Sequence, residues 1–333
     1  MKKIKTIALL MLLAFGLQVK GQKADALEVQ KNIDAIFEDY GKIQSKIKKW
    51  IKSKDKIEKD SFEYFTQVFI NPLLKDIKIA GENASPTQNV LVQFYAIQTY
   101  SSATSIFRKH GMTALALKLN NNYNELLNFK TEINGLALTN GVLRNISMEK
   151  ISIAQYNYLY QLYALANESN NQKLLLFTSK RILNNKRAGL NDQSISAMYL
   201  FDVSFAQNDF IRAFEYGELF LNKFANLSFE NKKLIKDRTR LENQKFVKRF
   251  YESSVNLLGT NKSLLNAQNI SKYGVIGQKY SIPNLHLYMQ AILVRIGQID
   301  EKNKIQELSN QSKNLKDPTL FNFFEQKLGK LKK

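Results

Sequence analysis

The clearest pattern of hydrophobic and polar positions lies near the start of the chain. Between residues 29 and 50, apolar side chains recur every three or four residues, as a long helix with one buried face requires. The set comprises Val29, Ile33, Ile36, Tyr40, Ile43, Ile47 and Trp50. A second apolar face over residues 61–79, formed by Phe62, Phe65, Phe69 and Leu73/Leu74, predicts the next helix. Residues 22–80 are therefore expected to form a helical hairpin, with Trp50 buried against the second helix.

Helical periodicity continues through residues 85–333. Ser85 and Pro86 are typical of an N-cap and a first helical position, and His110-Gly111 is a stop signal, so a helix is predicted between them. Another is expected from about residue 113 to 133. Further breaks are expected near Gly135, Gly141, Asn184–Gly189, Asn226, Gly259, Gly274 and Pro318. With four prolines, fourteen glycines and no convincing strand, the predicted fold is all-α, built from antiparallel helix pairs.

Two segments suggest internal repetition with a period of 41 residues. "YLYQLYALANES" at 158–169 aligns with "YLFDVSFAQNDF" at 199–210, and each is followed by a second amphipathic helix. The second copy resembles a tetratricopeptide repeat (TPR), because three residues lie where that family places its Tyr, Ala and Ala: Phe210, Ala213 and Phe220.

The segment "RIGQIDEKNKIQEL" at 295–308 is similar to the helix-turn-helix junction of the same family, with Gly297 at the turn. The resemblance covers residues 150–310. It implies a TPR-like α-solenoid whose concave surface binds a peptide or another protein. An irregular helical bundle is the alternative.

The N-terminus has the layout of a secretory signal peptide. Lysines precede an apolar run from Ile7 to Leu17, and small and polar residues follow it. The run is shorter than the roughly 20 residues that a membrane-spanning helix needs. We expect cleavage after Gly21, with Ala24 and Ala26 as an alternative site. The segment resembles signal peptides of the Bacteroidota, in which a small residue followed by Gln is common at the cut.

The chain contains no cysteine. A lipoprotein needs a cysteine after the apolar run for acylation, so tethering of that kind is not expected, and no disulfide can form. No second apolar stretch has spanning length. The predicted localisation is therefore periplasmic or secreted, with no transmembrane segment after removal of residues 1–21.

Residues that could carry chemistry are sparse. With His110 and His286 as the only histidines and no cysteine, the usual zinc sites cannot be assembled. No metalloprotease, nucleophile-elbow, phosphate-loop or dinucleotide motif is present. Two carboxylate pairs, Glu38–Asp39 and Glu215/Glu218, could in principle serve a hydrolase of envelope polymers. Their positions also fit the solvent-exposed faces of amphipathic helices. We therefore predict that the protein is not an enzyme and binds no cofactor or metal; a hydrolase is the least favoured hypothesis.

The net charge of +20 falls to +16 when the four lysines of residues 1–21 are removed. Such a balance attracts anionic partners. Lysine predominates over arginine, and lysine lacks the planar fork that reads bases, so nucleic acid is not expected. The basic runs 42–59, 231–249 and 327–333 are each interpreted as solvated faces, with contact to a polyanion as the alternative.

These observations favour a non-catalytic, exported helical-repeat protein that mediates protein–protein interaction in a bacterial cell-envelope assembly. The alternative is a basic adaptor for an anionic lipid or glycan surface, such as lipopolysaccharide or membrane headgroups. The residues predicted to bind the protein partner are Tyr158, Tyr163, Tyr199, Asp202 and Tyr216. The predicted basic surface comprises Lys46, Lys48, Lys49, Lys52, Lys232, Lys233, Arg238, Arg240, Lys248 and Arg249.

Overall fold

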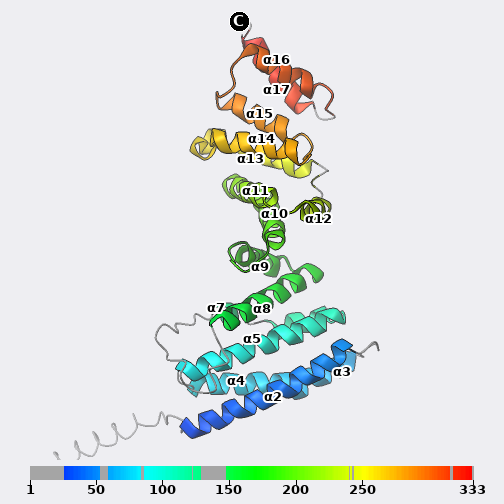
Figure 1. Cartoon of the computed structure of the whole chain (residues 1–333), viewed down its shortest axis with the longest axis vertical. Coiled ribbons are helices and arrows are strands. Elements are labelled where there is room, and N and C mark those ends of the chain that lie inside the picture. Colours follow the sequence, from blue (N-terminus) through cyan, green and yellow to red (C-terminus); the bar gives the residue numbers. More distant parts are fainter. Residues whose placement is uncertain are drawn as a thin grey trace, which may run out of the picture. The chain divides into compact units, whose positions relative to one another are not determined.

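A computed structural model describes most of the chain as helices joined by short turns (Figure 1). The described residues are 26–52, 59–83, 86–121, 123–128, 148–239, 241, 244–315 and 318–331. None of them lies in a strand, which confirms the all-α prediction. The predicted signal peptide and its cleavage site lie outside these residues. In the described part of the chain, no helix combines the length and apolar character needed to cross a membrane.

The chain divides into two compact units, an N-terminal unit up to Asn171 and a C-terminal unit from Gln172 onward. The sequence predicted a boundary between residues 80 and 85 instead. Helices α2 (Ala26–Lys52) and α4 (Asn71–Asn83) both pack against α5 (Pro86–Lys109). The predicted hairpin and the helix that follows it therefore belong to one unit.

Helix α2 is the single long helix that the heptad pattern predicts. Its stripe isoleucines are buried where they are described, at positions Ile36, Ile43 and Ile47. Trp50 is partly buried, with its ring centroid 4.9 Å from that of Phe62 and 4.7 Å from that of Phe65. Both phenylalanines lie on α3 (Lys59–Phe65). Contact between Trp50 and the following helix is thus confirmed, but the predicted buried side chain is only partly buried.

A π-helical turn, η1 (Thr66–Ile70), joins α3 to α4. Phe62 and Phe65 are buried as expected, but Phe69 is 37% exposed, which corrects its predicted inward position. A π turn closes its hydrogen bond over five residues instead of four, so it shifts the buried face by about one position. Ile70 consequently takes the inward place predicted for Phe69.

The predicted helix 113–133 is interrupted. It forms α6 (Thr113–Leu119) and α7 (Tyr123–Asn128), separated at the buried residue Asn120. The Asn120 side-chain amide donates to Thr104 Oγ1 and to the Ala116 carbonyl, both at 2.7 Å. It also accepts from the Tyr158 hydroxyl at 2.8 Å. A buried amide must satisfy its polar groups, and such side-chain bonds compete with helix continuation. The predicted breaks at 135 and 141 lie outside the described residues.

The last helix of the N-terminal unit, α8 (Met148–Glu168), packs against α5. The C-terminal unit contains α9 (Gln172–Leu183), α10 (Leu190–Ala206), α11 (Phe210–Ala225), α12 (Phe229–Thr239), α13 (Lys245–Thr260), a short 3₁₀ turn (Lys262–Leu264), α14 (Ala267–Lys279), α15 (Leu285–Arg295), α16 (Lys302–Ser312) and α17 (Thr319–Leu331). The predicted breaks at 184–189, 226 and 318 are confirmed, and Gly259 lies at the end of α13.

Within the C-terminal unit, α10–α11, α14–α15 and α16–α17 form helix pairs, and α11, α13, α15 and α17 contact one another in succession (Figure 1). Helix α12 departs from this scheme, because it packs chiefly against α10. The irregular placement of α12 creates the groove described below.

Two glycines of this unit are packing residues. A Cβ at Gly217 would lie 2.4 Å from Cδ2 of Phe250, so the missing side chain makes room for that ring. Gly274 lies inside α14, which corrects its predicted role as a break. It is buried, and a Cβ there would approach His286 Nδ1 to 3.3 Å. At both positions the glycine lets neighbouring helices come close.

Several helices end in the same hydrogen-bonded cap. A residue with positive φ follows the helix, and the next N–H binds a carbonyl five residues earlier, as in the Schellman motif. The positive-φ residues are Gly111, Asn170, Asn208, Ser281 and Gly297. Asn208 lies 38 residues after Asn170, whereas the predicted repeat had a period of 41 residues.

Candidate partner-binding groove

The predicted partner-binding residues divide between the two units. Tyr158 and Tyr163 lie on α8 of the N-terminal unit, whereas Tyr199, Asp202 and Tyr216 lie in the C-terminal unit. The side chain of Tyr158 is fully buried and bonded to Asn120, which corrects its prediction as a surface residue.

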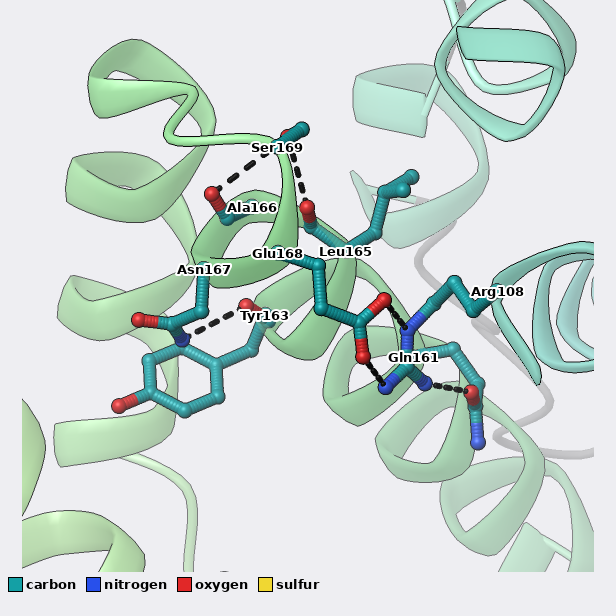
Figure 2. A network of polar contacts seen from close by, with 8 residues as sticks. All are labelled: Arg108, Gln161, Tyr163, Leu165, Ala166, Asn167, Glu168 and Ser169. Carbon is teal, nitrogen blue, oxygen red and sulfur yellow. Dashed lines mark hydrogen bonds and ion pairs between the residues drawn. The ribbon is translucent and has the colours of Figure 1, made fainter. Parts of the chain in front are cut away.

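Tyr163 is partly buried near the end of α8, beside a polar network that ties α8 to α5 (Figure 2). Arg108 of α5 binds both carboxylate oxygens of Glu168, at 2.9 and 2.6 Å, and Gln161 Oε1 at 2.5 Å. Figure 2 shows Tyr163 pointing away from Arg108. The bidentate geometry and partial burial of Arg108 make this network a structural link between the two helices.

Tyr199 and Asp202 line a groove in the C-terminal unit, between α10, α12 and the start of α13. Its volume is about 440 Å³. The lining residues are Ile195, Met198, Tyr199, Asp202, Arg238, Thr239 and Lys245. The four residues from α10 are spaced by three and four, so they form one face of that helix. The sequence missed Ile195, Met198, Thr239 and Lys245, although Thr239 and Lys245 lie within the basic run 231–249.

The acidic residue of the groove is paired. Asp202 Oδ1 lies 2.6 Å from an Nη atom of Arg249 on α13. The Arg249 guanidinium also lies over the ring of Phe205, 5.1 Å from its centroid. Its side chain is 25% exposed, which leaves it less screened than a surface ion pair. The structure thus brings together one predicted partner-binding residue and one predicted basic residue.

Tyr199 is partly buried at the end of the groove nearest α9. Its hydroxyl donates to Gln172 Oε1 at 2.8 Å, and burial raises the pKa of the phenol. The ring therefore stays neutral and fixed at physiological pH. Tyr216 lies on α11, partly buried against the core, and is not one of the groove residues.

The predicted basic surface is mixed. Lys46, Lys48, Lys49 and Lys233 are exposed as expected, and Arg238 is exposed beside the groove. Lys248 is partly buried. The side chain of Lys52 and the whole of Arg240 lie outside what the structure describes.

Lys232 corrects its prediction as a surface lysine. It is 9% exposed, its ammonium donates to the Leu227 carbonyl, and it lies 4.3 Å from the ring centroid of Tyr280. A backbone acceptor and an aromatic face together hold the charge inside. The sequence pattern of the basic run did not predict the burial of Lys232, because nothing in it distinguishes a lysine that faces the core from one that faces solvent.

A second surface in the N-terminal unit combines aromatic and basic residues. Tyr64, Val68 and Phe69 are 62%, 44% and 37% exposed. Tyr64 and Phe69 line one pocket with Trp50, Asp60 and Lys46. The ammonium of Lys46 is 5.4 Å from the Trp50 ring centroid. We call Lys46, Trp50, Tyr64 and Phe69 the aromatic patch. Sequence reasoning missed it because the π turn that exposes Val68 and Phe69 leaves no clear signature.

The two histidines are the remaining candidates for chemistry. The ring of His110 packs 5.1 Å from that of Phe62. Burial lowers the pKa of His286, whose Nδ1 has no hydrogen-bond partner among the described residues. Within the same residues, no cluster of three or more His, Asp or Glu side chains could hold a metal ion.

The carboxylates are also engaged. Glu38 is exposed and Asp39 is partly exposed, and their carboxylates lie 3.2 and 3.0 Å from the Lys42 ammonium. Glu218 accepts from the buried Tyr273 hydroxyl at 3.0 Å, and burial raises the pKa of Glu218. Glu215 is exposed on the same helix.

No family model, no curated protein and no solved structure matches this chain.

Proposed function

We propose that this is a non-catalytic, exported helical-repeat protein that binds a protein partner of the bacterial cell envelope through the groove between α10, α12 and α13. The single observation that carries the proposal is the groove itself. It combines an apolar floor and a fixed tyrosine on α10 with basic side chains on α12 and α13. Interface centres are typically built from aromatic residues, methionine and arginine with a polar rim.

A TPR-like arrangement of the C-terminal unit is part of the proposal. It is supported by the helix pairs, by the common cap that follows α10 at Asn208, α14 at Ser281 and α15 at Gly297, and by the succession of contacts from α11 to α17. Repeats of this kind typically present binding surfaces made from successive helices. The irregular packing of α12 is what favours the alternative of a helical bundle.

Export to the periplasm or beyond is proposed from the N-terminal sequence. The charged start, the short apolar run and the small residues near Gly21 are typical of a cleaved signal. Mass spectrometry of the mature protein purified from its host tests this directly. An N-terminus at Gln22 is expected, and an intact Met1 would contradict export by this route.

Photo-crosslinking tests the partner-binding proposal. A photoreactive phenylalanine analogue replaces Tyr199 in the groove or, as the matched control, Val275, which is 59% exposed on α14 of the same unit. Irradiation of host cells is expected to yield a reproducible protein adduct from position 199 and none from 275. Adducts with lipid or glycan alone, or equal adducts from both positions, would refute a protein partner at the groove.

The aromatic patch favours a second candidate function, contact with an anionic envelope surface. Exposed aromatic side chains next to lysines suit an interface where rings enter the headgroup layer and ammonium groups meet phosphate. Co-sedimentation with phosphatidylglycerol vesicles at low and high salt tests it. Binding should fall when salt shortens the range of the attraction below about 8 Å and should be lost in Lys46→Glu/Lys49→Glu. Binding that survives both changes would remove this candidate.

A further inference from the structure

We infer that the ligand of the groove is an acidic peptide segment with apolar side chains interspersed. The inference rests on the proposed function and adds the chemistry of the partner. Three observations carry it: the charges that line the groove, the helix end that borders it, and its apolar floor.

The lining has an excess of positive charge. Among the residues that the structure describes, neither Arg238 nor Lys245 has an acidic partner, and both line the groove. The carboxylate of Asp202 is engaged by Arg249. Two cations therefore face the groove without a counter-charge from the described residues. Complementary charge of this kind selects an anionic partner and speeds its association.

The start of α13 adds to this positive potential. Lys245 is its first residue, its first turn contains no acidic residue, and no side chain caps it. The N-terminus of a helix carries a partial positive charge, which an acidic residue in the first turn normally offsets. Here a lysine reinforces it instead. A carboxylate from a bound segment would supply the missing charge.

The floor of the groove selects for apolar side chains as well. Met198 is buried, and Ile195 and Tyr199 are partly buried on the same face of α10. The volume of the groove, about 440 Å³, falls within the range of ligand sites, about 300–1,000 Å³. A nucleic-acid strand would need a longer track of cations and stacking aromatic rings. A peptide that alternates acidic and apolar residues satisfies both the rim and the floor.

Fluorescence anisotropy with defined peptides tests the inference. The probe is a fluorescein-labelled 12-residue peptide of alternating glutamate and leucine, and the comparison peptides replace leucine by serine or glutamate by lysine. The protein is the mature chain and its Arg238→Glu/Lys245→Glu variant. The matched control is Lys233→Glu/Lys262→Glu, which makes the same change of net charge at exposed positions of the same unit. Far-UV circular dichroism verifies that every variant is folded.

The glutamate–leucine peptide should bind the unaltered chain, and the groove variant should lose about tenfold in affinity, which corresponds to about 1.4 kcal/mol. The control variant should keep its affinity within about threefold. Replacement of leucine by serine should also weaken binding, and the lysine–leucine peptide should not bind. Equal losses in the groove variant and the control, or equal binding of the lysine–leucine peptide, would overturn the inference.

The outcomes separate this inference from the function on which it rests. If the groove variant still forms the protein adduct from position 199 and the acidic peptide does not bind the unaltered chain, the partner site stands and its acidic ligand is refuted. If position 199 gives no protein adduct at all, the proposed function is refuted, whatever the peptide does. If the groove variant loses binding to phosphatidylglycerol vesicles while the peptide binds it normally, the cations serve a lipid surface instead.

Discussion

Two lysine-rich helices of this protein, α2 and α12, use lysine in different ways. In α2 the buried positions are occupied by isoleucine, and Lys46, Lys48 and Lys49 remain exposed. In α12 the buried positions are Ile235 and Lys232, and the ammonium of Lys232 is held by a carbonyl and an aromatic ring. Helix α2 has a continuous apolar stripe, whereas α12 has almost none.

The difference shows what a basic run does and does not reveal. A long apolar stripe fixes which side of a helix faces inward, so Lys46, Lys48 and Lys49 of α2 lie on the outer side. A helix with few apolar residues is placed by its neighbours, and one of its lysines can then be drawn inside. Lysine count alone therefore does not identify a surface, and the two helices border different candidate sites: α2 the aromatic patch and α12 the groove.

The largest expected effects concern the isoleucines that anchor the two helices. Ile43→Ala and Ile235→Ala should each lower the free energy of unfolding by about 3 kcal/mol, because both side chains are fully buried. The matched control is Leu234→Ala, at a position 40% exposed next to Ile235. Urea unfolding followed by circular dichroism measures all three. A loss for Ile235→Ala no greater than for Leu234→Ala would show that α12 is not anchored as described.

Trp50→Ala should cost about 2 kcal/mol, less than the roughly 3–5 kcal/mol of a fully buried aromatic residue, since the ring is only partly buried against Phe62 and Phe65. Trp50 is the sole tryptophan, so its fluorescence reports the N-terminal unit. Emission at the wavelength of free tryptophan in the native protein would contradict its contact with α3.

The sharpest contrast within α12 is between neighbouring lysines. Lys232→Ala should cost about 1.5 kcal/mol, because it removes the buried stem and leaves the Leu227 carbonyl without this donor. Lys233→Ala, at an exposed position, should stay within about 0.5 kcal/mol of the unaltered protein. Thermal unfolding of the two variants measured side by side decides the matter. Equal effects would mean that Lys232 is solvated.

The smallest effect is expected on α2. Lys48→Ala/Lys49→Ala should change the free energy of unfolding by no more than about 0.5 kcal/mol, since both side chains lie in solvent. Urea unfolding followed by Trp50 fluorescence measures it. A loss comparable to that of Ile43→Ala would show that these lysines pack inside and would remove the contrast between the two helices.

Much of the helical framework could be predicted from the sequence because long apolar stripes and strong stop signals act locally. The stripe of α2, the Pro86 start and the Gly111 stop all belong to this class. The π turn at 66–70 and the interruption at Asn120 could not be predicted, because each depends on packing with residues far along the chain.

The candidate groove was only partly predictable for the same reason. Tyr199, Asp202, Arg238 and Arg249 were each predicted, but as members of two unrelated surfaces. Their assembly depends on α12 packing against α10, and no local pattern encodes that contact. Tyr158 and Lys232 failed as surface predictions because burial of a polar side chain is decided by the partner it finds inside.

The central claim, that the groove holds a protein partner, is tested most directly by parallel photo-crosslinking from Tyr199 in the groove and Tyr64 in the aromatic patch. Both positions carry the same photoreactive residue in otherwise identical host cells. A reproducible protein adduct from position 199, with none of the same mass from position 64, is the predicted result. A protein adduct from position 64 together with none from position 199 would contradict the claim.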